Sequence, residues 1–166
     1  MLTVLAKNRH NEENRATIVL PAQEGQLRAF RELLGAESDR EISIQYAGTG
    51  RLWYTDTILL ENNLKGNPIT IDELNLFAYQ LSRMDENIIK KYDDTMSGYT
   101  DDLTVAGIKS LVNEAYDTIA QAAGHDESPL YYDGENIDEC LAANAELKSR
   151  DPATEQTEYG GMTITL

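Results

Sequence analysis

Two kinds of hydrophobic pattern alternate along the first 50 residues. Residues 2–6 (LTVLA) and 16–21 (ATIVLP) are rich in β-branched side chains, and the polar stretch between them is typical of a hairpin connection. From Gly25 to Gly35 the apolar residues recur with a helical period, and alternation with a period of two returns in residues 41–48 (EISIQYAG). The pattern predicts a ββαβ unit whose helix covers one face of a short sheet.

The next stretch, AGTGR at residues 47–51, contains two closely spaced glycines. A P-loop would need a Lys-Ser/Thr pair that opens a helix after such glycines, so we interpret this stretch as a turn. The sequence RLWYTD that follows indicates further strand. We expect Trp53 and Tyr54 to pack against that sheet, with the alternative that one of them lies at a subunit contact.

Three amphipathic helices are predicted between residues 63 and 124. Thr70 and Glu73 have the spacing of a capping box, which starts a helix that continues to about residue 81. Asp85 is placed to cap a second helix, and the third helix should run over about residues 104–121, with Gly124 near its end. We expect these helices to form a bundle with acidic outer faces.

The last 42 residues give a less regular pattern. They predict a turn at Asp133-Gly134, a short helix near residues 137–147, a polar loop around Pro152 and a final strand at 162–166. The expected fold class is α+β, elongated, with an N-terminal ββαβ unit (residues 1–62), a central acidic helical bundle (63–124) and a small mixed α/β C-terminal region (125–166). The single cysteine, Cys140, excludes an internal disulfide, and we interpret it as a small half-buried apolar residue.

The formal net charge of -15 is concentrated in the second half of the chain. Residues 1–60 hold 8 acids and 7 bases, whereas residues 84–166 hold 18 acids and 5 bases. Such a field repels nucleic acid and acidic membrane surfaces and attracts basic partners. A role in solubility alone is the alternative. The acids that we assign to a candidate partner-binding surface are Asp85, Glu86, Asp93, Asp94, Asp101, Asp102, Glu114, Asp117, Asp126, Glu127, Asp133 and Glu135.

Enzymatic and metal-binding patterns are weak. His10 and His125 are the two near-neutral acid-base groups, and both fall in predicted loops with no nucleophile beside them. The stretch DGENIDE at residues 133–139 lacks the ligand spacing of an EF-hand. The start of the chain lacks the apolar stretch of a signal peptide, and no run is long enough to span a membrane. We therefore expect a cytoplasmic protein that is not an enzyme and that uses no cofactor or metal.

Three segments resemble the ArdA antirestriction protein family. The stretch ITIDELNLFAYQLSRMDENIIKKYDD at residues 69–94 is similar to the family pattern I-x-E-L-N-x-L-A-x-x-L-x-x-(L/M)-(D/E), which precedes an acidic helix. GIKSLVNEAYD at residues 107–117 resembles a later element with the pattern I-x-x-L-I-N-x-x-Y, and ATIVLPA resembles an early strand that ends in Leu-Pro. The likeness covers about residues 16–120, and residues 125–166 depart from the family pattern.

This resemblance implies a dimeric, elongated, acidic protein of the kind carried by mobile genetic elements. Its carboxylates would mimic the phosphates of bent DNA and occupy the DNA groove of type I restriction-modification enzymes, without binding nucleic acid or a membrane. Duplex DNA has one charge per about 1.7 Å, so such a mimic needs many carboxylates. Fifteen acids lie between residues 85 and 146. An acidic adaptor for another basic partner, related to transcription or conjugation, stays open as the alternative, as does a hydrolase whose site the sequence does not reveal.

Overall fold

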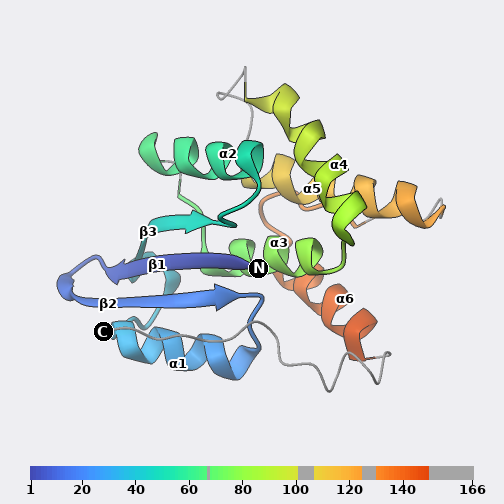
Figure 1. The fold of residues 1–166 in the computed structure, drawn as a ribbon. Helices are drawn as coiled ribbons and strands as arrows, with labels where there is room; N and C mark the ends of the chain where they lie inside the picture. The colour runs from blue at the N-terminus through green and yellow to red at the C-terminus, as the bar shows by residue number, and fades with distance from the viewer. Residues whose placement is uncertain (67, 101–106, 125–129, 150–166) are drawn as a thin grey trace.

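A computed structural model describes residues 1–66, 68–100, 107–124 and 130–149, with side chains up to residue 143 in the last helix. Three antiparallel strands, β1 (Leu2–Asn8), β2 (Asn11–Leu20) and β3 (Ile42–Gly48), form a sheet with the order β2-β1-β3 (Figure 1). Helix α1 (Glu24–Leu34) buries Leu27, Phe30 and Leu34 and contacts β2. Its last turn ends at Gly35, where φ is 66°. The predicted ββαβ unit is confirmed.

The segment after β3 is a helix, so the prediction of further strand in RLWYTD is wrong. Helix α2 covers Trp53–Leu64. The turn before it is closed by the carboxylate of Asp56, which accepts hydrogen bonds from the Thr49 N–H (2.7 Å) and hydroxyl (2.9 Å) and from the Gly50 N–H (2.9 Å). Gly50 adopts a positive φ of 77°. These tertiary contacts override the strand preference of Trp, Tyr and Thr in the same stretch.

Four further helices complete the described fold: α3 (Ile71–Ser82), α4 (Glu86–Met96), α5 (Ile108–Ala123) and α6 (Ile137–Ser149), with short 3-10 turns η1 (Asp39–Glu41) before β3 and η2 (Ser97–Tyr99) after α4. The α+β class is therefore confirmed. The predicted caps are present, since the Thr70 side chain accepts from the Glu73 N–H and Asp85 accepts from the Ile88 N–H at 2.8 Å. Helix α5 begins four residues later than predicted, and the predicted strand at 162–166 lies outside the described residues.

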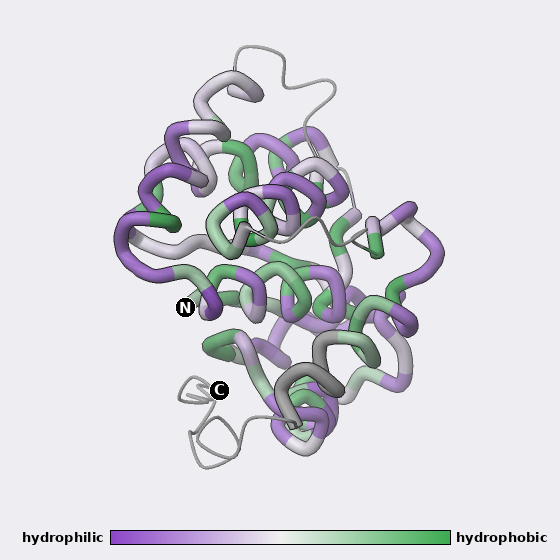
Figure 2. The backbone as a smooth tube through the Cα atoms, turned by 90° about the vertical axis from the view of Figure 1, so that its right-hand side faces the viewer, coloured by the Kyte–Doolittle hydropathy of each residue, from purple (hydrophilic) through white to green (hydrophobic). Residues whose placement is uncertain are grey.

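Helix α3 lies at the centre of the molecule. Eight of its twelve residues are buried, and it contacts β2, α5 and α6. The buried apolar side chains of the sheet and of the helices form one cluster, which extends from Leu2 to Cys140. Figure 2 shows hydrophobic and hydrophilic residues alternating along the helices, as expected for helices that cover a core with one face.

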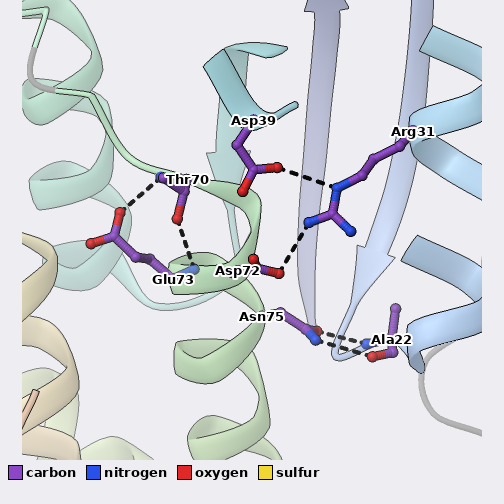
Figure 3. Close-up of polar contacts among 7 residues, drawn as sticks. All are labelled: Ala22, Arg31, Asp39, Thr70, Asp72, Glu73 and Asn75. Carbon is purple, nitrogen blue, oxygen red and sulfur yellow. Dashed lines mark hydrogen bonds and ion pairs between the residues drawn. The ribbon is translucent and has the colours of Figure 1, made fainter. Parts of the chain in front are cut away.

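Polar side chains of α3 connect it to the N-terminal unit (Figure 3). The Asn75 amide makes two hydrogen bonds with the backbone of Ala22, donating to its carbonyl (3.0 Å) and accepting from its N–H (2.8 Å). Asp72 accepts from Arg31 of α1 (3.1 Å), which also binds Asp39 (3.2 Å). Burial raises the pKa of Asp72, and the Arg31 charge opposes that rise. These contacts fix α3 against α1 and the chain that follows β2.

Tyr132 anchors the segment before α6. Its hydroxyl donates to Glu73 Oε2 (2.5 Å), its N–H donates to Asn113 Oδ1 (2.9 Å), and its carbonyl accepts from Asn113 Nδ2 (3.0 Å). Burial, followed by the hydrogen bond to the Glu73 carboxylate, raises the pKa of Tyr132 above its usual range. The side chain of Tyr132 therefore holds this segment against α3, and its backbone holds the segment against α5.

We expect Tyr132 to make the protein sensitive to alkali. Because the pKa of Tyr132 is raised in the folded state, its contribution to stability is fully present below the unfolded pKa of about 10 and is lost as the pH rises above that value. Replacing Tyr132 with Phe should lower the free energy of unfolding at pH 7 but make its decrease above about pH 10 less steep. Urea unfolding at a series of pH values measures this, and equal slopes for the two proteins would contradict the assignment. The other tyrosines whose pKa is raised, buried Tyr92 among them, account for a remaining slope.

Candidate functional site

The candidate acidic surface lies on α4, on α5 and in the turn before α6. Asp85, which caps α4, and Glu86 and Asp94 of α4 are exposed, and so are Asp133 and Glu135 in the turn. Glu114 and Asp117 of α5 are half-buried. The remaining candidates comprise one buried residue, Asp93, and four that lie outside the described residues, namely Asp101, Asp102, Asp126 and Glu127.

Asp93 does not belong to the exposed surface, so its assignment to an outer helix face is wrong. Its side chain points into the contact between α4 and the start of α2, where Oδ1 accepts from the Thr55 N–H (2.9 Å) and the Thr55 hydroxyl (2.8 Å). Oδ2 lies 3.5 Å from the Tyr54 nitrogen. A carboxylate at this place satisfies N–H groups of the first turn of α2 and complements the positive end of its dipole. Asp93 therefore has a structural role.

Two tyrosines hold the carboxylates of α5. The Tyr99 hydroxyl donates to Glu114 Oε1 (2.8 Å), and the Tyr131 hydroxyl donates to Asp117 Oδ1 (2.7 Å). These hydrogen bonds are the main reason why the pKa values of both tyrosines are raised. Glu114 and Asp117 are three residues apart and lie on neighbouring positions of one helix face. The tyrosines thus orient two negative charges without neutralising them.

Asp133 organises the turn that precedes α6. Its Oδ1 accepts from the Glu135 N–H (2.8 Å) and the Asn136 N–H (3.0 Å), and Gly134 has a φ of 100°. These backbone hydrogen bonds lower the pKa of Asp133, and the nearby Lys109 lowers it further. The predicted turn is confirmed. Two further exposed acids follow in the first turn of α6, a position that favours acids, and the candidate set omitted them: Asp138 and Glu139.

Few cations balance these charges. Within the described residues, Glu86 is the one member of the candidate set that forms an ion pair, with Arg51 at 3.0 Å, and both side chains are largely exposed. An exposed ion pair of this kind contributes little to the stability of the fold. Lys90, Lys91 and Lys109 are exposed on the same helices. The described part of α4, α5 and the turn therefore carries an excess of negative charge, some of it held in place by hydrogen bonds.

The sequence also contains two histidines, one cysteine and possible metal ligands. His10 lies exposed in the turn between β1 and β2, where its N–H donates to Asn8 Oδ1, and His125 lies outside the described residues. No group of three His, Cys, Asp or Glu side chains in the described ranges is arranged to hold a metal ion. Cys140 is fully buried, not half-buried as predicted, and burial raises the pKa of its thiol. Among the helices described, none has the length of apolar sequence that a membrane span requires.

Comparison of the chain with protein-family models, with curated proteins and with solved structures gives no match. The likeness to the ArdA family therefore rests on the segments quoted above. The structure places those segments in β2, α3, α4 and α5.

The neighbouring residues Asp93 and Asp94 allow a direct comparison of a buried and an exposed acid. Asp93→Asn should lower the free energy of unfolding by about 1–3 kcal/mol, because the amide is a weaker acceptor for the α2 N–H groups and its NH₂ faces donors. Asp94→Asn should change it by less than about 0.5 kcal/mol. Urea unfolding of both variants measures the difference. Equal effects would show that Asp93 does not hold α2.

Proposed function

We propose that this protein is a DNA-mimic antirestriction protein that inhibits type I restriction-modification enzymes by occupying their DNA-binding groove. The observation that carries the proposal is the set of outward carboxylates on α4, on α5 and in the turn before α6, which have few cationic partners. The resemblance of residues 16–120 to the ArdA family supports the choice of target. An acidic adaptor for a different basic partner is the alternative.

The chemistry of a DNA groove explains why such a surface would compete. Proteins that hold duplex DNA neutralise several phosphates with Lys and Arg, and much of their affinity comes from the release of counterions. Carboxylates on a folded protein can take the place of phosphates in these contacts. Each exposed carboxylate contributes little to the free energy of binding, so the affinity should depend on many residues together.

Preorganisation adds to this argument. The hydroxyls of Tyr99 and Tyr131 hold Glu114 and Asp117, and backbone N–H groups hold Asp133. Side chains that are already ordered lose less conformational entropy on binding than free ones. A fixed array therefore suits a partner whose basic residues are themselves fixed by a rigid groove.

The proposed functional unit is a homodimer. A chain of 18.6 kDa is short relative to the DNA tract that a restriction-modification enzyme contacts, and two copies would lengthen the acidic surface. Repulsion between two chains of charge -15 requires a contact away from the acidic surface.

Removing charge from two different regions tests the proposal. One variant replaces four acids of the candidate surface with amides: Glu86, Asp94, Asp117 and Glu135. The control removes the same number of charges from exposed acids of the N-terminal unit: Glu13, Glu24, Glu32 and Glu37. We expect the first variant to compete with duplex DNA for a purified type I methyltransferase core at least about tenfold less well, and the control to compete nearly as well as the parent protein.

Two further measurements separate the alternatives. Competition by the parent protein should weaken as salt rises, and cells that carry a type I system should lose restriction when they express it. Undiminished restriction together with no binding to the methyltransferase core would refute the proposal and favour the adaptor. Equal losses in the two charge variants would mean that total charge matters and the surface does not. Loss of activity through one single acid would instead indicate a catalytic site.

A further inference from the structure

Helix α2 is apolar on two opposite sides. Its inner side buries Thr55, Ile58 and Leu59 and packs on β3 and α4. Its outer side leaves Trp53 76% exposed, Leu60 50% and Leu64 70% exposed. Large apolar side chains that gather on the exposed face of a helix are a candidate interaction site. In Figure 1, α2 lies at the outside of the molecule, beyond β3, which is an edge strand.

The outer side chains form one stripe with no charge in it. Trp53, Thr57, Leu60 and Leu64 follow each other at intervals of four, three and four residues, so they lie along one helix face. The Thr57 hydroxyl already donates to the Trp53 carbonyl within the helix (2.7 Å). We call these four residues the α2 stripe. It is about 16 Å long, at 1.5 Å per residue.

The spacing of the α2 stripe is complementary to itself. The four positions are symmetric about the midpoint between Ile58 and Leu59. Two copies of α2 in antiparallel contact would therefore set Trp53 opposite Leu64 of the partner subunit, and Thr57 opposite Leu60 of the partner subunit. Each large ring would then lie against an aliphatic side chain. This is the arrangement of an isologous twofold contact.

Charge also favours a second copy as the occupant. Residues 1–60, which include most of α2, hold 8 acids and 7 bases and are close to neutral, whereas the acidic surface lies on α4, α5 and the turn before α6. A basic partner would be drawn to that acidic surface. Two chains of like charge can approach each other best through an uncharged apolar face.

We propose that the α2 stripe is the contact surface of a homodimer, in which two α2 helices pack antiparallel about a twofold axis. The proposal names the surface of the dimer suggested above, but it rests on α2 and not on DNA mimicry. The stripe is small beside the roughly 800 Å² per partner of a standard interface, so we expect a weak dimer that dissociates in the micromolar range.

Trp53 is the single tryptophan of the chain, and it provides the test. The fluorescence of the unmodified protein is recorded from about 1 μM to about 300 μM, together with its sedimentation, a range in which small interfaces dissociate. We expect the Trp53 emission to shift to shorter wavelength over the same concentrations at which the mass doubles. Leu60→Asp should abolish both changes. Leu130→Asp, which places the same charge at an exposed leucine (40%) away from α2, should leave both unchanged.

Cross-linking tests the register. A mixture of Thr57→Cys and Leu60→Cys proteins should form a mixed disulfide under mild oxidation faster than either variant pairs with itself, because positions 57 and 60 face each other in the proposed contact. A strict monomer over the whole concentration range, or a dimer in which Trp53 stays solvent-exposed and Leu60→Asp has no effect, would overturn the proposal. Dimerisation without protection from restriction would refute the DNA-mimic function alone, and protection by a monomer would refute the dimer alone.

Discussion

The arrangement of the protein depends on the polar contacts of its most buried helix, α3. One carboxylate oxygen of Glu73 accepts a hydrogen bond from the Thr70 N–H at the start of α3, and the other accepts one from the Tyr132 hydroxyl of the segment before α6. On other sides of the same helix, Asn75 holds the Ala22 backbone and Asp72 binds Arg31. Glu73 is buried, and Asp72 and Asn75 are half-buried. Polar groups removed from water are costly unless they have partners, so these contacts favour one arrangement of the elements around α3. Of the elements that carry the acidic surface, the segment before α6 is held by the contact of Tyr132 with Glu73, whereas α4 is held against α2 by Asp93.

Two groups of acids can be distinguished among the described residues. Glu73 and Asp93 are buried, and their charges satisfy hydrogen-bond donors inside the protein. Asp94 and Glu135 are exposed to solvent. Loss of a member of the first group lowers stability, whereas loss of one member of the second has a small effect by itself. Only experiments that measure stability and binding separately can assign a phenotype to one group.

The sequence predicted the local elements well where period and caps agree, as in α1, α3 and α4. The sequence-based prediction failed where contacts with residues far away in the sequence determine the local conformation. Strand-forming residues at 53–57 lie in a helix because Asp56 closes the preceding turn and Asp93 binds the first N–H groups. Likewise, helical spacing cannot show that Asp93 faces α2 while Asp94 faces solvent. The Glu-Leu-Asn stretch that carries the resemblance to the ArdA family has its polar residues, Glu73 and Asn75, in internal contacts. That likeness therefore concerns the framework of the fold more than the acidic surface.

We expect a basic partner to contact the exposed acids and to leave the buried acids, Glu73 and Asp93, unaffected. Carboxyl-detected NMR of isotope-labelled protein, titrated with an oligo-arginine peptide at low salt, tests it most directly. We expect the side-chain carboxyl signals of Asp94 and Glu135 to move during the titration, while those of Asp93 and Glu73 stay in place. Shifts of Asp93 and Glu73 as large as those of Asp94, in a protein that remains folded, would contradict it.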